Sequence, residues 1–198
     1  MFEWILHVIE VGGYGGIFTL MVLENVFPPI PSEVILPLAG YSVATDGMSL
    51  LSVIMVATLG TVVGTMPWYI AGRVFGARRL KALSVRYGRW LTLSPSDIEA
   101  AEAWFQTHGK RAVLFGRLIP TVRTLISVPA GIAHLPLPTF LLYSFVGSLL
   151  WTSLLTYLGF ILGNQHERVA EYLNPVSDLV ILVIVAVYLY RVVTFKVK

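Results

Sequence analysis

The chain contains no cysteine among its 198 residues. Disulfide bonds, iron–sulfur clusters and thiolate metal sites are therefore excluded, and redox chemistry is not expected. The four histidines are scattered, and no pair has the spacing of a metal site. The sequence also lacks a Gly-x-x-x-x-Gly-Lys phosphate loop, so no nucleotide is expected. We predict a protein without cofactor or metal, and without a nucleic-acid partner.

Charge is also scarce. Charged residues make up 13% of the chain and hydrophobic residues 56%, with a mean hydropathy of +0.77. A typical soluble domain carries about 25% charged residues, so the composition excludes that class and predicts an integral membrane protein. Residues 49–72 carry no charge over 24 positions, and residues 135–163 carry none over 29. Each exceeds the roughly 20 residues that span a bilayer. We predict one all-α membrane domain over residues 1–198, with transmembrane helices at 4–24, 49–72, 138–163 and 176–194.

The positive charge is unevenly distributed. Eight Lys or Arg residues lie in residues 73–111, between the two charge-free stretches. Because cytoplasmic loops retain basic residues, this stretch is predicted to be cytoplasmic, together with both chain termini. Amphipathic helices are expected here. One should begin at Pro95, after a cap at Ser94, and end at Gly109.

Two apolar segments are interrupted by charge and proline. Residues 25–44 hold a run of prolines and Glu33, and residues 112–134 hold two arginines on either side of a proline. A charge or an open backbone is costly in lipid, so such segments survive inside protein or against a watery cavity. We predict that both segments re-enter the membrane, and the charge count gives them opposite entry sides. The pattern is an inverted-repeat transporter architecture with two broken re-entrant helical segments.

A short internal echo supports this repeat. In each segment an Ile-Pro pair precedes an ionisable residue and then an Ala-Gly pair. We assign roles in breaking or packing the helices to the prolines and glycines of the two segments: Pro28, Pro29, Pro31, Pro120, Gly40 and Gly131. Two further glycine pairs, Gly60 with Gly64 and Gly72 with Gly76, have the small-xxx-small spacing of closely packed membrane helices.

Arg117 and Arg123 are the candidate substrate-binding residues. They are six positions apart with a proline between them, so a helix break is expected to turn both towards one cavity. An arginine stays charged and binds phosphate through a planar fork, which suits a pair to the phosphate of a lipid. The alternative is that the arginines pair with Glu24 and Glu33 and only hold the fold together.

Glu24 and Glu33 are the candidate residues for proton coupling or gating. A carboxyl group in a low-dielectric site tends to keep its proton, whereas a nearby arginine favours the carboxylate. Protonation of the acids would then follow whether phosphate occupies the arginines. The alternative for Glu24 is a local role in capping the break that follows it.

The two broken segments also resemble a known family. The run from Phe115 to Thr124, followed by Pro129-Ala130-Gly131, resembles a signature of the DedA family, also called the SNARE-associated or VTT-domain superfamily. The stretch from Glu24 through Glu33 to Gly40 resembles the family's other signature. Further matching positions lie between them: Gly60, Gly64, Tyr69, Gly72, Arg73 and Gly76. One departure is Pro31-Ser32-Glu33, where many members have Pro-Gly-Asp; another is Thr65, where some members carry an acid.

The resemblance implies a lipid translocase rather than an enzyme. Bacterial members return undecaprenyl phosphate, the carrier lipid of wall polymers, to the cytoplasmic leaflet, or they move phospholipids. Members depend on two membrane acids and two arginines, which match Glu24, Glu33, Arg117 and Arg123. A lipid phosphate, protons and the bacterial inner membrane are the implied partners, and a homodimer is compatible with the sequence.

Two other functions remain open at this stage. One is a flippase or scramblase for phosphatidylethanolamine or other phospholipids, with the arginines as a headgroup guide. The other is an intramembrane lipid phosphatase, which needs a nucleophile or base beside the arginines. The side chains near enough in sequence form no evident dyad: Thr121, Thr124, Ser127 and His134.

Overall fold

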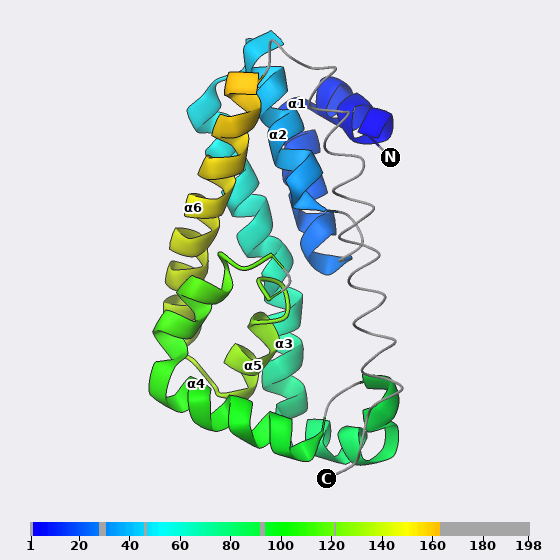
Figure 1. Ribbon diagram of the computed structural model, residues 1–198, viewed down its shortest axis with the longest axis vertical. Helices are drawn as coiled ribbons and strands as arrows, with labels where there is room; N and C mark the ends of the chain where they lie inside the picture. The colour runs from blue at the N-terminus through cyan, green and yellow to red at the C-terminus, as the bar shows by residue number, and fades with distance from the viewer. Residues whose placement is uncertain (1, 28–30, 46, 92–93, 121, 163–198) are drawn as a thin grey trace. The chain divides into compact units, whose positions relative to one another are not determined.

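A computed structural model of the chain describes residues 2–27, 31–45, 47–91, 94–120 and 122–162 (Figure 1). Every regular element in these ranges is a helix: α1 (Phe2–Val26), α2 (Ser32–Thr45), α3 (Leu50–Leu91), α4 (Pro95–Gly116), α5 (Ser127–Ile132) and α6 (Leu137–Leu162). Three helical stretches are long and apolar enough to cross a membrane: Glu3–Val26, Leu50–Arg79 and Leu137–Ile161. The predicted all-α membrane protein is confirmed. The predicted span at 176–194 lies outside the described residues.

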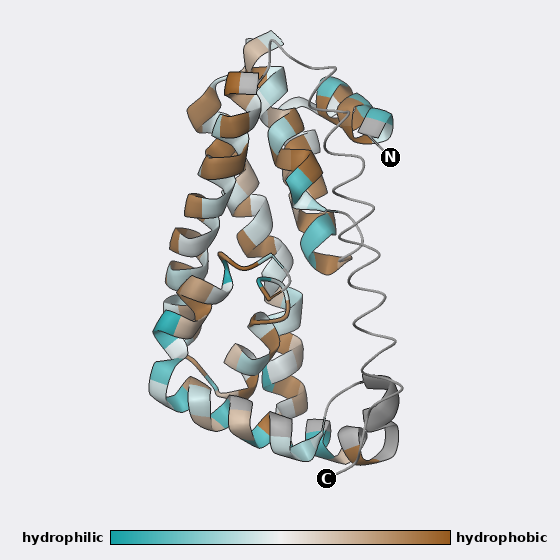
Figure 2. Ribbon diagram, in the orientation of Figure 1, coloured by the Kyte–Doolittle hydropathy of each residue, from teal (hydrophilic) through white to brown (hydrophobic). Residues whose placement is uncertain are grey.

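Helix α6 has an apolar outer face. Val146, Leu150 and Leu154 recur at every fourth position, and each is at least 39% exposed. In Figure 2, strongly hydrophobic positions of α6, drawn in brown, alternate with positions of intermediate hydropathy, drawn in pale colours. A soluble protein rarely leaves such a row uncovered, whereas a bilayer covers it with lipid tails. The opposite face of α6 is buried and carries hydroxyl groups.

The described residues form two compact units. The first unit contains the described residues up to Thr65 and from Ser144 onward, and the second contains those from Met66 to Tyr143. Helices α3 and α6 each contribute one part to the first unit and one part to the second. Each broken segment therefore belongs to a different unit.

The core of the first unit is built from α1, α2 and the first turns of α3. Its largest buried side chains include Ile9 and Leu20 of α1 and Ile35 of α2. Helix α1 also packs closely on α3, because a Cβ placed at Gly64 would lie 2.7 Å from Cβ of Asn25. The predicted packing role of Gly60 and Gly64 is confirmed, since both face the α1 backbone.

The core of the second unit surrounds Tyr69 of α3. Its ring stacks on Phe140 of α6 with centroids 4.5 Å apart, and its hydroxyl donates to the carbonyl oxygen of Leu135 at 2.6 Å. The hydroxyl also accepts a hydrogen bond from Nη1 of Arg73 at 2.8 Å. Phe105 of α4 joins the same cluster, and α4 packs against α5. These contacts fix the frame that carries the second broken segment.

The two units contain the same helix crossing. In the first, a Cβ at Gly40 of α2 would lie 2.1 Å from the carbonyl oxygen of Thr156, and one at Gly159 would lie 2.1 Å from that of Pro37. In the second, a Cβ placed at Gly131 of α5 would lie 2.2 Å from the carbonyl oxygen of Tyr69, and one at Gly72 would lie 2.2 Å from that of Val128.

The matching residues of the two crossings keep a constant offset. The same 91 positions separate Pro37 from Val128 and Gly40 from Gly131, and the same 87 positions separate Tyr69 from Thr156 and Gly72 from Gly159. The internal repeat suggested by the sequence echo thus has a counterpart in backbone contacts.

Two glycines behave differently from the sequence prediction. Gly76 was expected to pack, but it has φ 63° and ψ 167°, interrupts α3, and has no atom within 4 Å of a Cβ placed on it. It is a break in the helix, in a backbone region that is essentially restricted to glycine. Gly109 was expected to end a helix, but α4 continues through it to Gly116. Its missing side chain instead makes room for Leu135, whose Cδ1 would lie 3.3 Å from a Cβ there.

Candidate functional site

The second broken segment is a series of turns between α4 and α5. Between Gly116 and Ser127 the described residues form turns and no regular helix. Short-range backbone hydrogen bonds hold the turns, including Val122 N to Ile119 O at 3.0 Å and Arg123 N to Ile119 O at 2.9 Å. Pro120 is exposed within these turns, and its missing N–H suits a non-helical position.

Arg117 is tied into this segment by its guanidinium group. The side chain is 1% exposed, and its Nη1 donates to the carbonyl oxygen of Arg123. Its Nη2 donates to Oγ of Ser127 at 3.0 Å, and its Cζ lies 5.6 Å from the centre of the Phe140 ring. Charged donors make hydrogen bonds about twice as strong as neutral ones. Arg117 therefore closes the break by linking its start to Arg123 and to the first residue of α5.

Arg123 lies at the other end of that link. It is 5% exposed, so a second guanidinium group is buried in the same short stretch of chain. Thr124 and Ser127, which follow it, are also buried, and both carry hydroxyl groups. The segment thus concentrates positive charge and hydroxyl donors in an apolar frame, the set of groups that binds a phosphate.

The first broken segment holds the acids. Glu24 lies near the end of α1 and is 4% exposed, and Nδ2 of Asn25 donates to its Oε2 at 2.7 Å and to the carbonyl oxygen of Met21 at 2.9 Å. Asn25 itself lies against Gly64 of α3. The side chain of Glu24 is therefore held in place by an amide that is itself packed between two helices.

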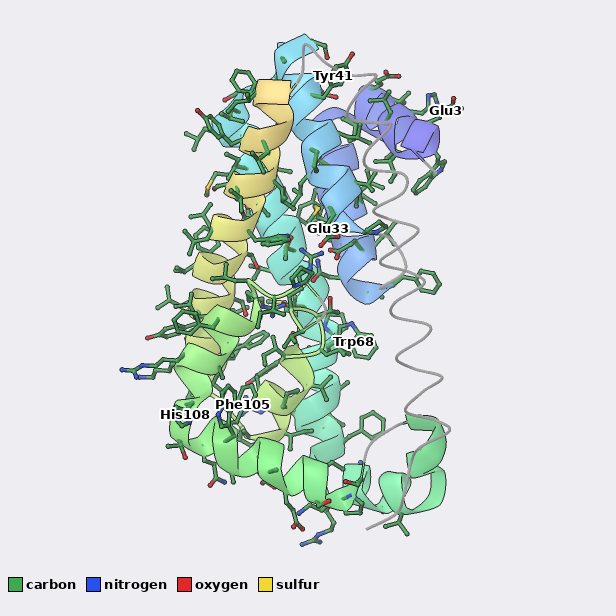
Figure 3. The ribbon with its side chains drawn as sticks, in the orientation of Figure 1. Glu3, Glu33, Tyr41, Trp68, Phe105 and His108 are labelled. Atoms are coloured by element: carbon green, nitrogen blue, oxygen red, sulfur yellow. The ribbon has the colours of Figure 1, made fainter. Side chains whose placement is uncertain are left out.

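Glu33 is in the first turn of α2 and is partly exposed (Figure 3). Pro31 immediately precedes this helix, and its carbonyl oxygen accepts from Val34 N at 3.1 Å. Pro37, one turn later, has no N–H to offer the carbonyl oxygen of Glu33. The backbone of Glu33 thus keeps an acceptor that an unbroken helix would have used. Pro28 and Pro29 lie outside the described residues.

The sequence-predicted residues fall into two groups. Glu24 and Glu33 belong to the first unit, and Arg117 and Arg123 belong to the second. Sequence reasoning did not assign the contacts that hold them, which come from Asn25 for the acid and from Ser127 and Phe140 for the arginine. Asn25 adjoins Glu24 and so was visible in the sequence. Ser127 and Phe140 follow Arg117 by 10 and 23 positions across a non-helical stretch, where no periodicity points to them.

The fold and these buried charges define a polytopic helical membrane protein with an ionisable site in each of two repeated units. The VTT domain family matches residues 30–161, a range that includes Glu33 and both arginines. The chain belongs to the VTT-domain, or DedA, family of membrane proteins.

The chain is similar in sequence to several bacterial proteins, of which three are described. The chain is 39% identical to the alkaline phosphatase-like protein of Lactococcus lactis strain IL1403, over all of this chain and 93% of the relative. It is 33% identical to undecaprenyl phosphate transporter A of Staphylococcus aureus, over 92% of this chain and 90% of the relative. It is also 33% identical to undecaprenyl phosphate transporter A of Bacillus subtilis, over 91% of this chain and 88% of the relative. Comparison with solved structures gives no match.

Proposed function

We propose that the chain is a secondary transporter that returns undecaprenyl phosphate from the outer to the inner leaflet of the bacterial plasma membrane, coupled to protons. Two relatives that it covers almost fully are named for transport of this lipid. The observation that carries the proposal is the burial of Arg117 and Arg123 in one helix break, joined through the hydrogen bond from Arg117 to the Arg123 carbonyl oxygen. Arginine stays charged and offers a planar fork of donors, so two arginines buried in one break suit an anionic headgroup.

Both arginines supply positive charge to the lipid phosphate, but only one of them is proposed to bind it directly. Arg117 uses two donor groups to hold the break closed, so it fixes the position of the Arg123 backbone. Arg123 is then the residue whose guanidinium forks onto the phosphate oxygens. The polyprenyl tail stays among lipid tails throughout, because it has no polar group to bury.

Glu24 and Glu33 are assigned to proton coupling. Glu24 is buried and held by Asn25, so its charge state affects a site from which water is largely excluded. A buried carboxylate is costly unless it is paired, and protonation removes that cost. Proton entry from outside would accompany movement of the lipid phosphate inward, with both termini in the cytoplasm.

Transport in proteoliposomes tests this proposal. Undecaprenyl phosphate in the outer leaflet is measured by an added phosphatase, and phosphatidylethanolamine by an added amine reagent, with and without an imposed pH gradient. We expect gradient-driven loss of accessible undecaprenyl phosphate for wild type and for Arg111→Ala, an exposed α4 residue, but not for Arg123→Ala. Normal transport by Arg123→Ala contradicts the assignment. Equal movement of both lipids without a gradient favours the alternative, a phospholipid scramblase.

A lipid phosphatase is a second candidate because one relative is named alkaline phosphatase-like. Ser127, the first residue of α5, carries a hydroxyl that accepts a hydrogen bond from the guanidinium of Arg117. Release of inorganic phosphate from undecaprenyl pyrophosphate by the purified protein, lost in Ser127→Ala, would support this candidate. Absence of phosphate release alongside lipid movement supports transport alone.

A further inference from the structure

The buried face of α6 carries a row of hydroxyl groups through the first unit. Ser144, Ser148, Thr152 and Thr156 recur at every fourth residue, and each is at most 3% exposed. Residues four apart lie on one face of a helix with Cβ atoms about 5–6 Å from each other. Over twelve residues the row extends about 18 Å, since a helix rises about 1.5 Å per residue.

A second row on α3 meets the first. Thr58, Thr61 and Thr65 are buried and follow a helical stripe, and Oγ1 of Thr58 lies 2.7 Å from Oγ1 of Thr152. The two helices run in opposite directions through this contact (Figure 1). From the Thr58–Thr152 contact, Thr65 and Ser144 therefore lie towards the same end.

The Thr58–Thr152 pair has two proton arrangements. Thr58 can donate to the carbonyl oxygen of Ile54 at 2.7 Å, and Thr152 to that of Leu149 at 3.2 Å. Each hydroxyl has one proton, so whichever residue donates to its own helix accepts from the other. Reversal of the donor requires only rotation of two hydroxyl groups.

Three polar atoms along this face of α6 have no hydrogen-bond partner among the described residues. They are Oγ of Ser148, Nε1 of Trp151 and Oγ1 of Thr156, all within two turns of helix. Leaving a buried polar group without a partner is unfavourable, and such groups in native proteins usually bind ordered water. Successive hydroxyls one turn apart are separated by a distance that one water molecule bridges.

The α3 row ends one residue from a contact with α1 at the residue next to Glu24. Gly64, directly before Thr65, packs against Asn25, and Asn25 donates to the Glu24 carboxylate. On the helices around Glu24, α2 contributes Glu33, whereas residues 50–65 of α3 and 144–162 of α6 contain no Asp, Glu, His, Lys or Arg. The hydroxyl rows are thus the polar route along α3 and α6 to that carboxylate.

We infer that the hydroxyl rows of α3 and α6 bind a file of water molecules that delivers protons from the outer end of α6 to Glu24. A hydronium ion at the Thr156 end gives a proton to the nearest oxygen. Each water or hydroxyl then passes one proton on as it receives another, and the Glu24 carboxylate takes the last. One proton moves and nothing is oxidised or reduced. The inference rests on the proposed proton coupling and on the orientation predicted from the basic loop.

The first test measures water in the file and does not depend on lipid transport. Because the chain has no cysteine, single thiols can be introduced at Ser148→Cys and Thr156→Cys, with Leu150→Cys and Leu154→Cys on the lipid-facing side as matched controls. Silver ions enter water but not hydrocarbon, and a thiol that has bound silver resists later maleimide labelling of the denatured protein. We expect protection at 148 and 156 and none at 150 and 154. Equal labelling at all four positions would mean that the hydroxyls are dry packing contacts, as Ser and Thr often are in membrane helices.

The second test measures proton movement. Ser148→Ala and Thr152→Val remove a hydroxyl with little change in volume, and Thr19→Val does the same at an exposed position of α1. Reconstituted with undecaprenyl phosphate and a pH-sensitive dye inside the vesicles, the first two variants should lose lipid-dependent proton entry, while wild type and Thr19→Val retain it. Wild-type proton entry in Ser148→Ala and Thr152→Val overturns the inference and leaves the proposed transport intact. If wild type moves the lipid without moving protons, that result contradicts the proposed proton coupling and the inference that rests on it.

Discussion

Substituting alanine for Gly40 tests the helix crossing of the first unit. A Cβ at this position would lie 2.1 Å from the carbonyl oxygen of Thr156 and 2.8 Å from the nitrogen of Phe160. Both are backbone atoms, so no side chain can rotate away. Ordinary contact begins at 3.4 Å, and the helices must separate by about 1.3 Å, the difference between 3.4 Å and 2.1 Å, to accept one methyl group.

The expected cost follows from that displacement. Overpacking a membrane or soluble core typically costs about 1–3 kcal/mol, and a clash between two backbones belongs at the upper end of this range. Gly15 on α1 is the matched control, because a Cβ there meets no atom within 4 Å. Gly15→Ala should be neutral or stabilising by up to about 1 kcal/mol, the difference in helix propensity. The two variants should therefore differ by about 3–4 kcal/mol.

Thermal unfolding in detergent micelles measures this difference through tryptophan fluorescence. At about 2–4 °C per kcal/mol for chains of this size, Gly40→Ala should lower Tm by roughly 6–12 °C. Gly131→Ala should have a similar effect, because its Cβ would lie 2.2 Å from the carbonyl oxygen of Tyr69. A wild-type Tm for Gly40→Ala, or a drop in Gly15→Ala as large as that in Gly40→Ala, would refute the argument from close backbone approach.

Three further predictions concern the second unit. Arg117→Ala should destabilise the protein by about 3–6 kcal/mol in a chemical or thermal unfolding assay, because it removes two hydrogen bonds from a charged donor, each contributing about 1.5–3 kcal/mol; a loss below about 1 kcal/mol would contradict the role in closing the break. Tyr69→Phe should cost about 1–3 kcal/mol in the same assay, since it leaves the Leu135 carbonyl oxygen without its donor, and an unchanged Tm would show that another donor replaces it. Glu99→Gln breaks a surface ion pair with Lys81 and should change stability by less than about 1 kcal/mol, with any change disappearing at high salt.

The broken segments were predictable because charge and proline are rare in this chain and costly in lipid. Glu24, Arg117 and Arg123 were found by that criterion, and all three are buried. The partners of Arg117 were not predictable, because a run of turns has no fixed period and relates Arg117 to Phe140 only through the folded chain. Sequence periodicity places residues on a shared face only where the helix is continuous.

Glycine is the residue whose role the sequence could not assign. The pairs Gly60/Gly64 and Gly72/Gly76 have identical spacing, yet the first pair packs on α1 while Gly76 breaks α3. Gly109 is a residue type that often ends a helix, but here it lies inside α4 and packs against Leu135. Absence of a side chain permits close packing, a left-handed backbone or a helix end, and only tertiary contacts decide among them.

The break at Gly76 limits how far the longest helix runs straight. As one straight rod, the 42 residues of α3 would measure about 63 Å, roughly twice the hydrocarbon thickness of a bilayer. The break instead directs the remainder of α3 aside (Figure 1). The backbone break at Gly76 thus falls close to residue 72, where the charge-free stretch ends and basic residues begin. An insertion of one helical turn before Gly76 would move the segment after it by about 5.4 Å along the helix axis, a distance comparable to the thickness of one headgroup layer.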